Sequence, residues 1–152
     1  MIEVQPEPPN REVSHVFRVR YAETDAMGIV HHSSYVIWLE MGRTEFMRAF
    51  GFTYRQLEEM GVVMPVLEIG VRYRQPAFYD DELRISTWVE ELSRTKIKLA
   101  YKIVRTSDDK LLTEGFSLHT FTGHDGRLIR ITHHAEAWAR LRSMSPHLEV
   151  KE

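Results

Sequence analysis

The residues of this 152-residue chain best suited to chemistry lie in one segment, residues 21–35. A carboxylate, Asp25, precedes Gly28 there, and a stretch with helical periodicity begins soon afterwards, near Ser33. A carboxylate can act as a nucleophile or as a general base, and the unpaired N–H groups at a helix N-terminus can polarise a carbonyl group. A carboxylate beside a carbonyl polariser is the minimum equipment for acyl transfer, so Asp25 is the candidate catalytic residue.

Other residues of the same segment are predicted to bind a substrate. The first backbone N–H groups of the helix, including that of Ser33, would donate to a carbonyl oxygen. Gly28 lets the loop turn sharply or approach a substrate closely, although an ordinary turn glycine fits the pattern equally well. His32 can donate to a substrate or orient Asp25. Tyr21 can place its hydroxyl near Asp25 or point outward from a strand.

Adjacent histidines, His31 and His32, raise the alternative of a metal site. Further ligands would then come from four of the other histidines, His119, His124, His133 and His134. Neighbouring side chains point in different directions on most backbones, and the chain has no His-Glu-x-x-His pair. We therefore predict no catalytic metal.

Composition excludes several classes of function. The chain has no cysteine, which rules out disulfides, thiolate catalysis and cysteine-based metal sites. A formal net charge of −2 gives no bulk attraction to nucleic acid or to an anionic membrane. No run approaches the roughly 18 apolar residues of a membrane span, and the start of the chain lacks the pattern of a signal peptide. We expect a cytoplasmic protein.

The elements expected to position the segment are a strand before it and a helix after it. The strand begins at His15 and alternates through residue 21, and the helix, capped by Ser33 or Ser34, ends at Gly51. Tight turns then separate further predicted elements, which are a short helix over 54–60, strands over 62–75, 83–92, 96–106 and 111–122, and a final helix over 132–142.

This order of elements predicts the fold class α+β, with an antiparallel sheet of five to six strands wrapped around one long central helix. Apolar residues cover more than half of the helix circumference, as expected for a helix enclosed by a sheet. We expect a flexible lead-in over 1–12, a single domain over 13–145 and a C-terminal tail over 146–152.

The sequence resembles the hot-dog-fold acyl-CoA thioesterases of the 4-hydroxybenzoyl-CoA thioesterase type, and most closely the branch associated with the Tol-Pal system. The residues that carry the resemblance are Arg20-Tyr21, Glu23 to Val30, His32 to Tyr35, Glu40, Arg43 to Glu45, Tyr73 to Ala77, and Asp80-Asp81. The resemblance spans roughly residues 13–132. Met27 is a departure, because many relatives have Gly or Ala there, and it would reshape the acyl pocket.

The resemblance implies hydrolysis of a short-chain or aromatic acyl-CoA, with Asp25 in the position of the catalytic carboxylate and with Tyr21 and His32 lining the site. No cofactor is implied, since coenzyme A enters as part of the substrate. An acyl carrier protein could present the thioester instead. The resemblance also implies a homodimer or homotetramer with continuous sheets, to which an exposed Trp88 and the first strand after the helix could contribute an interface.

Two other functions stay open at this point. One is an enoyl-thioester hydratase or dehydratase on the same fold, whose characteristic motif this chain lacks. The other is a non-catalytic module that binds acyl-CoA, against which Asp25 counts in its full motif.

Charged residues outside this segment allow more than one interpretation. Glu40 is interpreted as a buried acid in a structural pair with Arg43 or Tyr73, in preference to a second catalytic acid. A set of basic residues on successive strands is a solvated face or a contact for the phosphates of coenzyme A: Arg94, Lys96, Lys98, Lys102 and Arg105.

Overall fold

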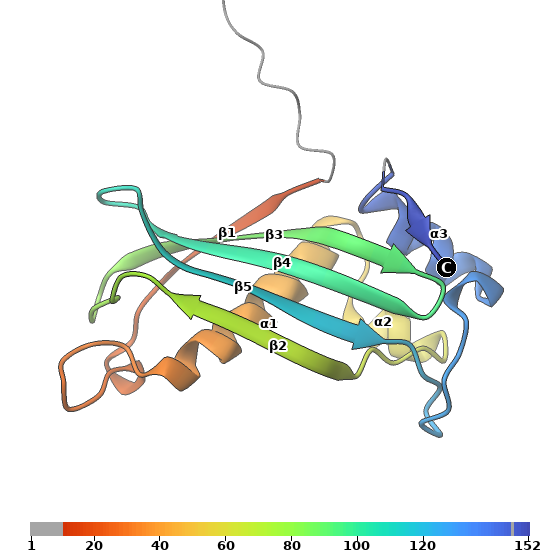
Figure 1. The fold of residues 1–152 in the computed structure, drawn as a ribbon, viewed down its shortest axis with the longest axis horizontal. Helices are drawn as coiled ribbons and strands as arrows, with labels where there is room; N and C mark the ends of the chain where they lie inside the picture. The colour runs from red at the N-terminus through yellow and green to blue at the C-terminus, as the bar shows by residue number, and fades with distance from the viewer. Residues whose placement is uncertain (1–10, 147) are drawn as a thin grey trace, which may run out of the picture.

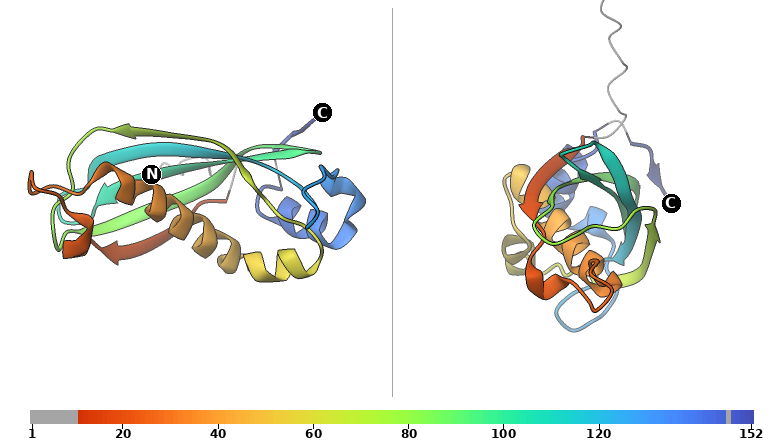
Figure 2. Two further views of the ribbon diagram at one scale, coloured as in Figure 1. Left: turned by 90° about the horizontal axis from the view of Figure 1, so that it is seen from below. Right: turned by 90° about the vertical axis from the view of Figure 1, so that its left-hand side faces the viewer.

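The computed structural model describes residues 11–146 and 148–152, in which a six-stranded sheet curls around one long helix (Figures 1 and 2). The strands lie side by side in the order β1 (Val13–Arg18), β3 (Glu82–Ser93), β4 (Lys96–Arg105), β5 (Lys110–Thr120) and β2 (Val66–Tyr73). These neighbours are antiparallel, and β6 (Val150–Lys151) pairs in parallel with the end of β3. The predicted α+β class is confirmed.

The helices are α1 (His32–Ala49), α2 (Tyr54–Glu59) and α3 (Ala135–Ser143). Helix α1 lies against the concave face of the sheet, whereas α2 and α3 lie together at one end of it (Figures 1 and 2). The buried side chains of α1 recur at helical spacing, as in Tyr35, Trp38, Leu39 and Phe46. They meet a sheet face on which Leu83, Ile85 and Val89 alternate with more exposed residues. Most of the core therefore lies between α1 and the sheet.

The loop between β2 and β3 ties the start of the chain to the start of α1. The Val19 N–H donates to the Asp81 carbonyl over 2.9 Å, and the Val30 N–H donates to the Ala77 carbonyl over 2.9 Å. Arg105, from the end of β4, contacts Asp81 at 3.2 Å and also pairs with Asp108. This loop forms the support on which the chemically interesting segment rests.

The start of α1 differs from the prediction of a serine cap. His31 is the N-cap, and its Nδ1 accepts the Ser33 N–H over 3.2 Å and contacts the Ser33 hydroxyl at 2.8 Å. An imidazole nitrogen one position earlier thus takes the role expected of Ser33 or Ser34. The first strand also ends sooner than expected, because residues 21–23 form a 3-10 turn after Arg18.

Two side-chain expectations are wrong. Glu40 is exposed, and it forms no ion pair within the described residues, since it lies on the solvent side of α1. Trp88 is half-buried rather than exposed, and the Lys102 ammonium lies 6.0 Å from the centre of its ring.

The two ends of the chain bear on the expected domain limits. The first described strand begins at Val13, and most of the expected lead-in, residues 1–10, lies outside the described residues. The expected tail over 146–152 contains β6, where Val150 pairs with Leu92 of β3.

Candidate active site

Asp25 lies in a tight loop closed by a bridge between Thr24 and Val30. Its N–H donates to the Ile29 carbonyl over 2.9 Å, and its side-chain Oδ1 accepts the Met27 N–H over 2.8 Å. Gly28 has a φ of +79°, in the left-handed region that favours glycine, so it makes the turn that closes the loop. One carboxylate oxygen is thus held by the loop, and the other is left for a ligand or water.

The start of α1 presents one backbone donor beside this loop. The His31 N–H is taken by the Glu23 carbonyl at 2.8 Å, and the Ser33 N–H is taken by the His31 ring. Among the residues that the structure describes, the His32 N–H has no hydrogen-bond acceptor. It is therefore the donor best placed to receive a carbonyl oxygen at the positive end of the helix.

Tyr73, at the end of β2, contacts the same turn of the helix. Its hydroxyl donates to the His32 carbonyl over 2.9 Å, and its ring packs edge-on against Tyr35, with the ring centres 5.0 Å apart. Desolvation raises the pKa of Tyr73, which keeps its hydroxyl protonated as a donor. Burial is also the largest cause that raises the pKa of Tyr35. Both phenols are therefore neutral donors at physiological pH.

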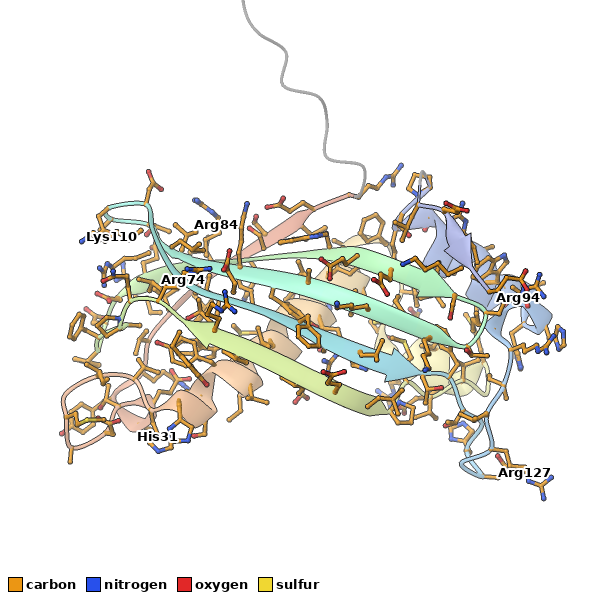
Figure 3. All side chains as sticks on the ribbon, viewed as in Figure 1. His31, Arg74, Arg84, Arg94, Lys110 and Arg127 are labelled. Atoms are coloured by element: carbon orange, nitrogen blue, oxygen red, sulfur yellow. The ribbon has the colours of Figure 1, made fainter. Side chains whose placement is uncertain are left out.

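A cavity of about 380 Å³ brings the predicted carboxylate and the helix start together. It is lined by Asp25, Met27, Ile29, Val30, His32, Tyr35, Tyr73, Arg74, Gln75 and Pro76. Figure 3 shows His31 and Arg74 at the same end of the molecule, opposite the end that carries Arg94 and Arg127. The cavity is mostly apolar and has a few polar residues, Asp25 and His32 among them, in its wall, which is the usual character of a small-molecule site.

The other predicted substrate-binding residues lie around the cavity rather than in its wall. Tyr21 is 77% exposed and packs edge-on against Tyr79, with the ring centres 5.7 Å apart. Gly28 makes the turn that closes the Asp25 loop and is not among the residues that line the cavity. Ser33 contributes to the helix cap through its N–H and its hydroxyl. Their roles toward a substrate stay predictions.

A second cavity, of about 530 Å³, opens on the sheet face turned away from α1 and lacks this chemistry. Its lysines are engaged: Lys98 pairs with Glu90 at 3.4 Å and lies over the Phe116 ring. Lys102 reaches Glu12 at 3.4 Å. We place the candidate active site at the smaller cavity, since the larger one does not contain the carboxylate and helix start.

Sequence reasoning missed the contribution of β2 to this site. The sequence pointed to Tyr73 as a contact for Glu40 and, together with the residues from Arg74 to Pro76, as part of the motif that carries the resemblance, but not as part of the site. Their position directly after a predicted strand was the available signal, because strand ends and loops often carry binding residues. Only tertiary structure brings that strand end against the start of α1.

The basic residues considered for phosphate binding are mostly engaged in ion pairs. Besides Lys98 and Lys102, Arg105 pairs with Asp81 and Asp108, and Arg94 lies 3.1 Å from Glu152. The Arg105 guanidinium lowers the pKa of Asp108 through a direct hydrogen bond. None of these four lines the candidate cavity, whereas Arg74 does, held by Glu114 at 2.7 Å.

Neither a metal-binding cluster nor a membrane-spanning helix occurs among the described residues. Over 11–146 and 148–152, no cluster of three or more His, Asp or Glu side chains is arranged to hold a metal ion. Over the same ranges, no helix has the length and apolar character needed to cross a membrane.

Comparison with known proteins places the chain in a family. The family model described as the thioesterase-like superfamily matches residues 19–150, and the protein belongs to this superfamily. The chain is 42% identical to YneP of Bacillus subtilis over 85 residues, which are 56% of this chain and 62% of YneP. It is 37% identical to the acyl-CoA thioester hydrolase YbgC of Escherichia coli over 97 residues, 64% of this chain and 72% of YbgC.

Solved structures agree with the sequence relatives. The DHNA-CoA thioesterase of Staphylococcus aureus superposes with a TM-score of 0.80 at 28% identity, covering 93% of this chain and 97% of that one. The expected hot-dog fold and the thioesterase family are confirmed. These relatives support a thioester hydrolase and do not favour the hydratase or the non-catalytic alternative.

Proposed function

We propose that the protein hydrolyses the thioester bond of a small acyl-CoA, giving the free acid and coenzyme A. The observation that carries the proposal is that Asp25 and His32 line one mostly apolar cavity and that the His32 N–H has no acceptor among the described residues. The names of similar proteins, such as acyl-CoA thioester hydrolase, support this choice of substrate.

In this mechanism the thioester carbonyl oxygen accepts the His32 N–H, which stabilises the negative charge that develops on it. Asp25 then acts by one of two routes. As a nucleophile, it attacks the carbonyl carbon, coenzyme A thiolate leaves, and water hydrolyses the resulting mixed anhydride. As a general base, it takes a proton from water, whose oxygen attacks the same carbon. A thiolate leaves without prior protonation, so one carboxylate and one donor are enough for either route.

The remaining residues have supporting roles in the proposal. His32 would contribute its side chain as a substrate contact in addition to its N–H, and Tyr21 would contact the substrate at the edge of the cavity. Gly28 would keep the Asp25 loop closed, and Ser33 would keep the helix start capped. No metal or cofactor takes part, and an acyl carrier protein is the second candidate for the thiol part of the substrate.

Asp25→Asn is the direct test. The amide keeps the shape of the side chain but is a poor nucleophile and base, so we expect turnover of short aliphatic and aromatic acyl-CoAs to fall by about 10²–10⁴-fold. Free thiol release measures it. Asp109→Asn, at the exposed tip of the β4–β5 hairpin, is the matched control and should keep wild-type turnover.

A mass measurement separates the two routes, and the thiol assay can refute the proposal. After a rapid quench with substrate, the mass of the protein rises by one acyl group only if Asp25 is the nucleophile. Wild-type turnover in Asp25→Asn, or no thiol release by the wild-type protein from any acyl-CoA, would contradict the proposed function.

The proposal includes a homodimer joined along β2. This strand ends the sheet order and carries exposed apolar side chains, among them Leu67 and Ile69. An unpaired apolar edge strand favours pairing with another chain. Light scattering after size-exclusion chromatography should give the mass of a dimer or of a tetramer, and a monomer at micromolar concentration would contradict this part.

Two finer assignments are proposals of the same kind. We also propose that the protein belongs to the Tol-Pal-associated branch, an assignment that rests on the residues that carry the resemblance. The cytoplasmic location stays a prediction from the sequence.

A further inference from the structure

Glu23 is a buried acidic residue to which the proposed reaction assigns no role. It is 8% exposed, and both carboxylate oxygens have partners. Oε2 accepts the Trp38 indole N–H over 2.6 Å, and Oε1 accepts the Arg20 backbone N–H over 2.8 Å. The Arg20 Nε lies 3.4 Å from the same oxygen. A carboxylate that is both buried and fully hydrogen-bonded is costly to replace, because its donors would lose their acceptor.

The backbone of Glu23 contacts the start of the same helix. Its carbonyl accepts the His31 N–H over 2.8 Å and the Ser34 hydroxyl over 3.3 Å. The side chain and the carbonyl of this single residue therefore hold α1 at the cap, in the first turn and, through Trp38, one turn further along.

These contacts affect both groups that act in the proposed reaction, the His32 N–H and the Asp25 carboxylate. By occupying the His31 N–H, Glu23 leaves the His32 N–H as the free donor at the helix start. Glu23 also lies just ahead of Asp25 in the same loop, so the helix contacts fix where that loop begins. A displacement of about 1 Å between reacting groups can cost about 10²-fold in rate.

We propose that Glu23 is the positioning residue that holds the Asp25 carboxylate and the His32 N–H at the separation needed for catalysis. This inference rests on the proposed thioester hydrolysis. Glu23 does not touch the cavity, and it acts through the loop and the helix start. The Trp38 indole is the anchor on the helix side, locked in the core at 2% exposure.

Glu23→Gln and Trp38→Phe break the same contact from opposite sides. Glutamine offers one acceptor oxygen where two donors need one each, so either the indole or the Arg20 N–H is left facing an NH₂ group. Phenylalanine keeps an aromatic ring but removes the indole donor. We expect each variant to lower kcat at least tenfold while KM changes less than threefold, because the ground-state contacts to the substrate are kept.

The double variant separates positioning from simple loss of stability. With the indole donor gone, the glutamine oxygen can serve Arg20 alone, so Glu23→Gln with Trp38→Phe should lose less kcat than the product of the two single losses. Glu45→Gln is the control and should match the wild type, because Glu45 lies at a half-buried position of α1, where its carboxylate pairs with Arg48, and makes no contact with Glu23 or Trp38 among the hydrogen bonds of the described residues. Thermal unfolding of every variant confirms that the proteins are folded at the assay temperature.

A second readout does not depend on turnover. The ¹H–¹⁵N resonance of the His32 amide reports the donor itself, and we expect it to shift or broaden in Glu23→Gln while the Glu45→Gln spectrum stays that of the wild type. Wild-type kcat in Glu23→Gln and Trp38→Phe, or an unchanged His32 amide, would refute the positioning role. Absence of wild-type turnover would instead refute the proposed function, and the amide readout would still decide on Glu23. Should Glu23→Gln fail to fold, Trp38→Phe alone carries the test.

Discussion

At the scale of single residues, the helix start works because its backbone donors are divided among different acceptors. Glu23 takes the His31 N–H, the His31 ring takes the Ser33 N–H, and the N–H between them is left for a ligand. An unpaired donor at a helix N-terminus strengthens the local positive potential, since the helix dipole adds to it. In the proposed mechanism, the position of the His32 peptide group therefore matters more than the identity of the His32 side chain.

Tyr73→Phe tests the second contact that holds this turn. The substitution keeps the edge-on packing against Tyr35 but removes the hydroxyl that donates to the His32 carbonyl. One neutral hydrogen bond contributes about 1 kcal/mol, so we expect kcat for acyl-CoA hydrolysis to fall about fivefold with little change in KM. Tyr79→Phe, which removes an exposed hydroxyl, is the control. Equal kcat values in the two variants would show that Tyr73 does not hold the helix start.

The sequence singled out the loop that carries Asp25, the proposed catalytic residue, but it predicted the surroundings of that loop less well. Asp25 stands out because a distinctive string of residues encloses it and a helix follows. The cap was misassigned because serine is the commoner N-cap, whereas here the preceding histidine supplies the acceptor. Tyr73 could not be placed, since its contact with His32 joins residues distant in the sequence.

At the scale of elements, the close approach of α1 to the sheet depends on Gly42. A Cβ at this position would lie 2.7 Å from Ile85 Cδ1 and 3.0 Å from Thr87 Oγ1, both in β3. Ile85 is fully buried and has little room to move away. The glycine thus allows a close approach of helix and sheet, and any larger residue would increase the distance between them.

Gly42→Ala has two opposing effects on the stability of the fold. Alanine gains about 1 kcal/mol of helix propensity over glycine, but overpacking a tight core costs about 1–3 kcal/mol. We expect a net loss of up to about 2 kcal/mol, seen as a fall of several degrees in Tm by calorimetry. Thr44→Ala, on the same helix and free of this contact, should not lower Tm. A Tm for Gly42→Ala at or above the wild type would mean that Ile85 can yield.

The elements themselves were predictable because each has a clear period or boundary. Alternation in β3 and β4, the boundary predicted between the strands over 96–106 and 111–122, and the apolar spacing of α1 all correspond to the structure. The predicted ends of strands were less accurate where pairing with another strand decides them. The strand expected over 62–75 pairs with β5 only over Val66–Tyr73, and the expected tail gains β6 from its pairing with β3.

At the scale of the whole molecule, a polar cluster lies inside the core between α1 and the sheet. His119 of β5 is fully buried, and its Nδ1 donates to the Met64 carbonyl over 3.2 Å. Its Nε2 therefore carries the lone pair, which faces the Ser117 hydroxyl at 2.7 Å and the Arg43 guanidinium at 3.4 Å. The Tyr101 hydroxyl extends this hydrogen-bonded network through a 2.6 Å contact with the Ser117 hydroxyl. This arrangement accommodates only a neutral imidazole.

The cluster makes the stability of the fold depend on pH. Burial first, and then the charge of Arg43, lower the pKa of His119 from 6.5 to about 4. Between these values the unfolded chain binds a proton that the folded chain does not. The contribution of His119 is therefore fully present above pH 6.5 and is lost as the pH falls toward 4. The total loss is about 3 kcal/mol, with a slope of up to about 1.4 kcal/mol per pH unit.

Urea unfolding at several pH values between 4.5 and 7.5 measures this dependence, and His119→Asn isolates the part due to the histidine. The asparagine amide can still donate to the Met64 carbonyl, but it does not titrate, so the slope over this range should be smaller than in the wild type. Carboxylates that protonate near pH 4 act on both proteins alike and cancel in the difference. Equal slopes would mean that His119 becomes protonated in the folded state, which would require Arg43 to move away from Nε2.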